Sequence, residues 1–288
     1  MKNKSLYLGL LCAVALGCAA FNVFAAGSGT EQSIYNYGYA KYTISPYSGS
    51  LAVTPFNSES GAARLSSSNY KQAFFQLAPH YSAQATITTC GVASAVMILN
   101  TVYANSQQTP PLSKSGSWYI PEDNAIDGNF TWTEENFFNA KVAGLLDKAI
   151  VEGKIKQNGK YNVGVGLDQL AKALNLQGLK AVDFHATSAE SKDITQFREL
   201  VKQITAEPTQ YMLVNYNLNV ELKLDGGHFA PVAAYDQGSD SVLLLDPWNA
   251  VGPWTWIKLV DLYKSMNTQD GKVYRGYILV DAKLRQMP

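Results

Sequence analysis

Apolar residues recur at helical spacing through the middle of the chain. Val92, Val96 and Leu99 fall on one face of a helix that would run from position 90 to position 103. The segment over residues 104–131 is polar and rich in proline and glycine, which predicts a surface excursion. The same reading predicts further helices over residues 71–79, 167–174 and 193–205 and a helix start at Thr133.

The last third of the chain changes character. Short runs of aliphatic and aromatic residues there predict strands, and the polar, glycine-containing segment 236–240 predicts a hairpin turn between two of them. Helices that precede an antiparallel sheet indicate an α+β fold and not a βαβ repeat. The predicted strands cover residues 211–218, 228–235, 241–245 and 274–280.

The N-terminus resembles a secretory leader over residues 1–25. Two lysines precede an apolar run over residues 6–24, and small residues up to Ala25 fit a signal-peptidase site. We therefore expect a periplasmic or secreted protein. An alternative leader would instead carry a lipid on Cys18. No later apolar run is long enough for a stable membrane span.

Composition divides the remainder in two. Residues 26–67, rich in Gly, Ser, Asn and Tyr, predict an irregular N-terminal segment, and residues 68–288 carry the regular pattern of the main domain. The 23 basic and 23 acidic side chains cancel, so charge provides no reason to expect nucleic acid as a partner. Nothing in the sequence indicates an oligomeric state.

Cys90 would be the one cysteine left after removal of the leader. A single thiol in an exported protein is either buried and inert or reactive. Cys90 stands where the polar stretch 86–89 gives way to a predicted helix, whose first N–H groups and dipole favour a thiolate. Gly91 would let a substrate approach closely. Taken alone, Cys90 fits a buried apolar role equally well.

A histidine and an aspartate stand on the two strands that flank the predicted turn. His228 follows two glycines at the start of one strand, and Asp246 ends the next. If these strands pair, the carboxylate can accept the imidazole N–H, fix the tautomer and stabilise the imidazolium. Taken singly, His228 fits a core histidine and Asp246 a turn residue. His80 and His185 lack a comparable context.

Gln84 lies in the loop that leads to Cys90. Its side-chain amide can join the Cys90 backbone N–H in an oxyanion hole. The order Gln, Cys, His, Asp matches papain-like enzymes, with a nucleophile helix in one half and an antiparallel sheet in the other. The expected substrate-binding positions are Gly91, Gly227, Phe229 and Asn249.

Three blocks of sequence carry a more specific resemblance. They are QATITTCGVAS at residues 84–94, GHFAP at residues 227–231, and a segment over residues 245–277 that includes Pro253, Trp256, Leu259, Met266, Asp270, Gly271 and Arg275. Together the blocks resemble the phytochelatin synthases and their shorter bacterial relatives. The match covers about residues 68–282.

The resemblance implies a glutathione γ-glutamylcysteinyltransferase with a papain-like fold. Cys90 would attack the Cys–Gly bond of glutathione and release glycine, with His228 as acid and base, Asp246 as its orienter and Gln84 as oxyanion donor. Water as acceptor would give γ-glutamylcysteine, and a second glutathione would give a phytochelatin. Asn249 stands where the family has an arginine, so it cannot offer a guanidinium to a substrate carboxylate.

We expect neither a cofactor nor a metal site in the protein, because no cluster of Cys, His and carboxylate stands at ligand spacing along the chain. A heavy metal such as cadmium or zinc would act through the thiolate of glutathione, which is the expected small-molecule partner.

Two other functions remain open. Papain-like peptidases of the C39 type, which cleave peptide leaders, share the Gln-x5-Cys-Gly block and often have Asp-Pro after the second strand, as at Asp246-Pro247. The segment over residues 256–276 argues against this alternative. A binding module without chemistry could instead use the Tyr- and Trp-rich surface, and the reactivity of Cys90 discriminates it.

Overall fold

The computed structural model describes residues 33–37, 40–44, 53–108, 110, 131–156, 164–222, 226–248 and 254–285. The predicted leader, most of the excursion over residues 104–131, and Asn249 lie outside these ranges. None of the helices in the described ranges combines the length and the apolar character that crossing a bilayer demands.

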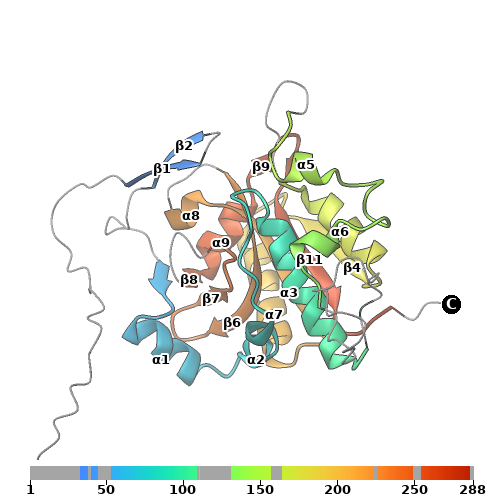
Figure 1. Cartoon of the computed structure of the whole chain (residues 1–288). Coiled ribbons are helices and arrows are strands. Elements are labelled where there is room, and N and C mark those ends of the chain that lie inside the picture. Colours follow the sequence, from blue (N-terminus) through green and yellow to red (C-terminus); the bar gives the residue numbers. More distant parts are fainter. Residues whose placement is uncertain are drawn as a thin grey trace, which may run out of the picture.

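A seven-stranded antiparallel sheet forms the centre of the molecule (Figure 1). Two short hairpins accompany it: β1 (Ser33–Tyr37) with β2 (Ala40–Ile44), and β9 (Gln269–Asp270) with β10 (Val273–Tyr274). The order across the sheet is β3 (Val53–Pro55), β8 (Thr255–Lys258), β7 (Ser241–Leu244), β6 (Gly227–Asp236), β5 (Gln210–Asn217), β11 (Gly276–Asp281) and β4 (Ala181–His185).

The helices agree with the pattern of the sequence in most places. Each predicted helix is present, and the start predicted at Thr133 is confirmed as a short helix that Thr133 caps. Helices α1, α5, α8 and α9 were not predicted. The helices are α1 (Glu59–Ser67), α2 (Gln72–Leu77), the 3-10 turn η1 (Ala78–His80), α3 (Cys90–Asn105), α4 (Glu134–Phe137), α5 (Lys148–Val151), α6 (Leu167–Leu176), α7 (Ser191–Ala206), α8 (Asn219–Leu222) and α9 (Leu259–Met266).

Helices cover both faces of the sheet. Side chains alternate along β5, so Leu213 packs with α3 and α6 in one apolar cluster, and Met212 and Val214 pack with α7 and α9 in another. The central strands β5 and β6 are buried along nearly their whole length, since helices cover both of their faces. The predicted α+β class is confirmed.

The hairpin between β6 and β7 turns at residues 236–240, as predicted. Asp240 has a φ of 47°, a left-handed backbone that non-glycine residues rarely adopt. Arg198 on α7 donates two hydrogen bonds to the Asp240 carboxylate, at 2.8 and 2.9 Å, and Tyr235 donates a third. These bonds to a neighbouring element hold the turn in its strained conformation.

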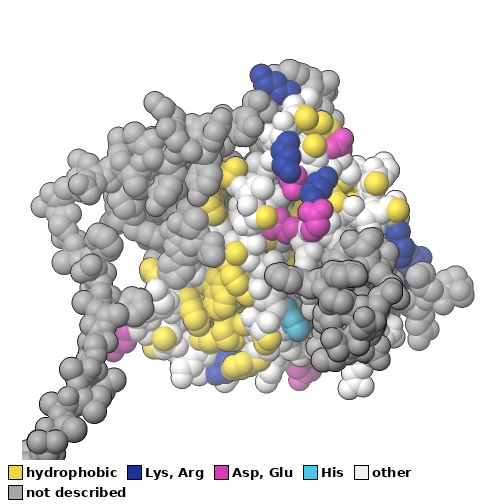
Figure 2. Space-filling model, in the orientation of Figure 1, with side chains coloured by type: hydrophobic (Ala, Val, Ile, Leu, Met, Phe, Trp, Pro, Cys, Tyr) yellow, Lys and Arg dark blue, Asp and Glu magenta, His cyan; other side chains and the backbone are white. Residues whose placement is uncertain are grey.

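Surface charges are intermingled on the face that Figure 2 shows, where lysine and arginine side chains lie beside aspartate and glutamate. Near α4 and α5, Lys154 pairs with Glu152 at 2.7 Å, and Lys148 lies between Glu135 and Glu152. Such pairing leaves little long-range field over the described side chains of this region.

The close pairing of β11 with β4 depends on Gly276. A Cβ at this position would lie 1.9 Å from the carbonyl oxygen of Phe184, which is backbone and cannot swing away. We expect Gly276→Ala to lower the free energy of unfolding by about 2–3 kcal/mol in urea denaturation.

Gly144→Ala is the matched control for this change. A Cβ at Gly144 meets nothing within 4 Å, so we expect a change within about 0.5 kcal/mol. Equal stabilities of the two variants would contradict the close approach of these strands.

Candidate active site

Helix α3 places Cys90 at its first turn. The helix runs for 16 residues and is buried along most of its length, so the apolar stripe predicted from Val92, Val96 and Leu99 is part of a wider buried surface. Cys90 is 8% exposed, and the free N–H groups of the first turn lie beside it. The site is therefore open to a small molecule but mostly closed to bulk water.

Close packing of α3 on β6 brings the thiol to the sheet. A Cβ at Gly91 would lie 2.5 Å from Cγ1 of Val165 and 3.2 Å from the ring of Phe229. The Ser94 hydroxyl donates a hydrogen bond to the backbone oxygen of Phe229 at 3.2 Å. Gly91 thus has a packing role, since protein side chains take the space over its Cα.

His228 and Asp246 meet through the hairpin. Nε2 of His228 lies 2.7 Å from Oδ1 of Asp246, and the two side chains are 2% and 5% exposed. Burial opposes a charged ring, but the charges of Asp246 and Cys90, together with hydrogen bonds to both, raise the pKa of His228 well above its usual value. These contacts favour a protonated ring, with Nδ1 left to face Cys90.

The backbone after Asp246 holds its carboxylate in place. The N–H of Trp248 donates to Oδ1 of Asp246 at 2.7 Å, so this oxygen accepts two hydrogen bonds. The Tyr81 hydroxyl donates to the Asp246 backbone oxygen, and the Gln84 N–H donates to the Pro247 oxygen, both at 2.9 Å. The loop before Cys90 and the loop after Asp246 are therefore joined.

Two adjoining clefts open at this point. The first, of about 180 Å³, contains Cys90 and His228 together with Gly227, Phe229 and Trp248. The second, of about 390 Å³, contains residues of α6 and of the β9–β10 hairpin. Both clefts are lined by Gly164, Val165, Asn215 and Asp270, so they form one continuous recess.

Comparison of the sequence with known protein families identifies the family of this chain. A sequence model of the phytochelatin synthase family matches residues 49–277, which is most of the chain. The chain belongs to the phytochelatin synthase family.

Three relatives from plants and yeast show how distant this member is. Glutathione gamma-glutamylcysteinyltransferase 1 of Lotus japonicus is 26% identical over 75% of this chain and 37% of the relative. The Arabidopsis thaliana enzyme of the same name is 24% identical over 75% of this chain and 38% of the relative. The Schizosaccharomyces pombe enzyme is 23% identical over 72% of this chain and 43% of the relative. The match thus spans only about two fifths of these relatives.

Gln84 remains a candidate, and its surroundings are specific. Its Nε2 donates to the backbone oxygen of Thr86 at 2.9 Å, which leaves one amide proton for another acceptor. Its Oε1 is buried without a hydrogen-bond partner in the described part of the chain. Ala85 N–H donates to Glu134 of α4 at 2.8 Å, which fixes the same loop from the helical side.

Two buried polar groups next to the clefts were not singled out as site residues from the sequence. Among the described residues, Asn215 Oδ1 and Arg275 Nε have no hydrogen-bond partner. The guanidinium of Arg275 lies over Gly227, where a Cβ would come within 3.3 Å of Nε and Nη2. Buried polar atoms left unpaired cost about 1–3 kcal/mol each, which marks this wall as one built to meet a polar ligand.

A second buried carboxylate lies close to His228 and Asp246. Glu221 on α8 accepts hydrogen bonds from Tyr216, at 2.7 Å, and from Thr255. Burial raises the pKa of Glu221 to about 7, and the charge of Asp246 adds to this, while the hydrogen bonds and the charge of His228 act in the opposite direction. Nothing in the sequence around Glu221 indicates that its side chain is buried next to Asp246.

The raised pKa of Glu221 makes a stability prediction. A carboxyl group whose pKa is higher in the folded than in the unfolded protein stabilises the fold at pH values below its unfolded-state pKa. That stabilisation is lost as the pH rises through the folded-state pKa, which is near 7. Gln mimics the protonated acid. We expect Glu221→Gln to match the parent at pH 5 and to exceed its free energy of unfolding by about 3 kcal/mol at pH 8.5.

Urea denaturation at the two pH values checks this expectation. Glu199→Gln, on the exposed face of α7, is the control and should behave like the parent at both. A stability difference for Glu221→Gln that does not change with pH would show that Glu221 is ionised throughout.

Proposed function

We propose that this chain cleaves the Cys–Gly bond of glutathione through a thioester on Cys90. The observation that carries the proposal is the buried His228–Asp246 hydrogen bond beside a thiol at a helix start. Family membership and the names of the relatives supply the substrate. A cysteine on a buried helix that faces histidine and aspartate on a sheet is also the reason to infer a papain-like fold.

The first half-reaction uses charges that the site already holds. The Cys90 thiolate attacks the carbonyl carbon of the substrate cysteine, and the imidazolium of His228 gives its proton to the departing glycine amine. The products are free glycine and a γ-glutamylcysteinyl thioester. Asp246 keeps the ring oriented and stabilises its charged form.

The second half-reaction returns the enzyme to its starting state. Neutral His228 takes a proton from water, and the hydroxide attacks the thioester to give γ-glutamylcysteine and the Cys90 thiolate. A second glutathione can replace water through its α-amino group, which lengthens the product to a phytochelatin. Cadmium or zinc would enter as a thiolate of that glutathione.

Gln84 is the side chain we assign to the oxyanion. Both tetrahedral intermediates place a negative oxygen near the start of α3, where the Cys90 backbone N–H is one donor. The remaining Nε2 proton of Gln84 is the second, because its other proton is held by Thr86. This pre-ordering of the amide reduces the reorganisation needed during reaction.

Arg275 and Asp270 are suited to the amino-acid head of the γ-glutamyl group. That head carries a carboxylate and an ammonium, and the second cleft offers a guanidinium from Arg275 and a carboxylate from Asp270. Nη1 of Arg275 is already fixed by Thr268, at 3.1 Å, so the guanidinium needs little ordering when it binds. This arrangement supplies the arginine that Asn249 does not.

Incubation of the purified protein with glutathione, with and without cadmium, tests the chemistry by mass spectrometry. We expect γ-glutamylcysteine and glycine, with Cys90→Ala and His228→Gln each lowering the rate about 10³-fold or more. His80→Gln, a histidine outside the clefts, should leave the rate unchanged. Untouched glutathione under both conditions would refute the proposal, and longer oligomers would measure the share of transfer.

Substitution of Arg275 tests the binding of the γ-glutamyl head. We expect Arg275→Lys, which keeps the charge but loses the planar fork, to raise KM for glutathione about 10–100-fold with a smaller effect on kcat. Arg285→Gln is the control, since Arg285 is exposed near the C-terminal end of the described chain. A fall in kcat alone would place Arg275 in positioning and not in substrate binding.

A further inference from the structure

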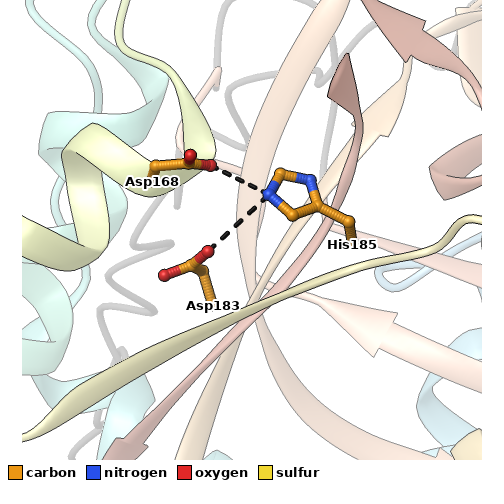
Figure 3. Close-up of side chains that lie close together, drawn as sticks. All are labelled: Asp168, Asp183 and His185. Carbon is orange, nitrogen blue, oxygen red and sulfur yellow. Dashed lines mark ion pairs between the residues drawn. The ribbon is translucent and has the colours of Figure 1, made fainter.

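Three potential metal ligands meet at the edge of the sheet, next to the second cleft, which one of them, Asp168, lines. Figure 3 shows Asp168 on α6 and Asp183 and His185 on β4, with both carboxylates directed at the same imidazole nitrogen. Nε2 of His185 lies 2.9 Å from Oδ1 of Asp168 and 3.7 Å from Oδ2 of Asp183. One donor atom from each residue falls within 4.8 Å of the other two.

The backbone explains why these side chains converge. Asp183 and His185 are two positions apart on a strand, so they point to the same side of the sheet. Helix α6 packs on β4 and carries Asp168 in its first turn. Asp168 lies 15 residues before Asp183 in the sequence. Spacing along the chain therefore indicates only the Asp183-x-His185 pair.

A backbone carbonyl fixes the protonation pattern of the ring. Nδ1 of His185 contacts the backbone oxygen of Tyr274, which can only accept a hydrogen bond, so Nδ1 carries the proton. In a neutral ring, Nε2 is then a lone pair that faces two carboxylates. Three acceptors at this distance repel one another unless a proton or a cation lies between them.

Charge and geometry favour the cation. Within the described residues, neither Asp168 nor Asp183 forms an ion pair with a lysine or an arginine, so two carboxylates face one imidazole. A tetrahedral Zn²⁺ with bonds of about 2.0–2.1 Å places its ligand atoms about 3.4 Å apart, between the two distances seen here. A histidine that donates its other N–H to a carbonyl is also the usual arrangement of a metal-bound imidazole.

We propose that Asp168, Asp183 and His185 bind one divalent cation of the Zn²⁺ class. A mixed nitrogen and oxygen set suits such a borderline ion better than Mg²⁺ or Ca²⁺, which take oxygen ligands. The three side chains are 47%, 33% and 26% exposed, which leaves a coordination position open to solvent or to a ligand in the second cleft.

The site would tie α6 and β4 to the β9–β10 hairpin. Asp168 and Tyr274 both line the second cleft, and Tyr274 precedes Arg275. A cation at His185 therefore fixes the wall that carries the guanidinium. The metal site itself rests on residues outside the catalytic contacts, and it holds whether or not the chain acts on glutathione.

Titration of the protein with ZnCl₂ alone, followed by calorimetry, tests the site. The full chain carrying Cys12→Ser, Cys18→Ser and Cys90→Ala serves as the parent, so that no thiol binds the ion. We expect one Zn²⁺ per chain, an affinity at least tenfold weaker in His185→Gln and in Asp183→Asn, and no change in the control His80→Gln. Zn²⁺ should also raise the Tm of the parent but not that of His185→Gln.

Asp168→Asn guards against loss of folding, since Asp168 is half exposed and Asn retains the side-chain shape. A folded Asp168→Asn protein, checked by circular dichroism, should bind Zn²⁺ at least tenfold more weakly than the parent. Absence of stoichiometric binding to the parent, or full affinity in all three variants, would overturn the site and leave an ion-paired imidazolium. Because no glutathione is present, neither result depends on the proposed activity.

Discussion

The hydrogen bond between His228 and Asp246 lies where almost no water reaches it. Moving two charges into such a place costs several kcal/mol per ion unless they are paired and their remaining hydrogen bonds are made. Trp248 supplies the second donor to Asp246, and Cys90 lies within hydrogen-bonding reach of the ring. The β6–β7 hairpin, the loop after Asp246 and the start of α3 each contribute one of the contacts that this buried pair requires.

The helical half and the sheet half are joined next to Cys90 and Gln84. Gly91 lets α3 approach Phe229, and the hydrogen bond from Ser94 to the Phe229 carbonyl holds that contact. The loop that carries Gln84 is fastened on the sheet side by Pro247 and on the helical side by Glu134. These two contacts fix the Gln84 loop relative to both halves of the molecule.

A row of polar groups extends from the first cleft, which contains Cys90, towards the edge of the sheet. Asn215 and Arg275 leave buried polar atoms beside the recess, and the acidic pair with His185 lies beyond them. Strand β11 runs between these groups, and Gly276 allows it to lie close to β4. In our two proposals, this part of the sheet carries the residues that bind the substrate and, nearer its edge, the residues that bind a cation.

Much of this protein could be predicted from local pattern. Helical spacing around Val92 and the polar, glycine-containing turn at residues 236–240 were enough to predict α3 and the β6–β7 hairpin, because both depend on contacts close in sequence. The hairpin also made the pairing of His228 with Asp246 predictable. Helix α9 was missed although Leu259, Leu262 and Met266 have helical spacing.

What the sequence by itself determined was the set of reactive residue types and the elements that bear them. Only the tertiary structure decided that Gly91 faces Val165, that Glu221 lies close to Asp246, and that Asp168 reaches His185. Each of these contacts joins residues of different segments, and which of them meet depends on how the elements pack. The raised pKa of Glu221 and the short distance between Asp168 and His185 arise from burial and packing, and no local pattern of residues carries that information.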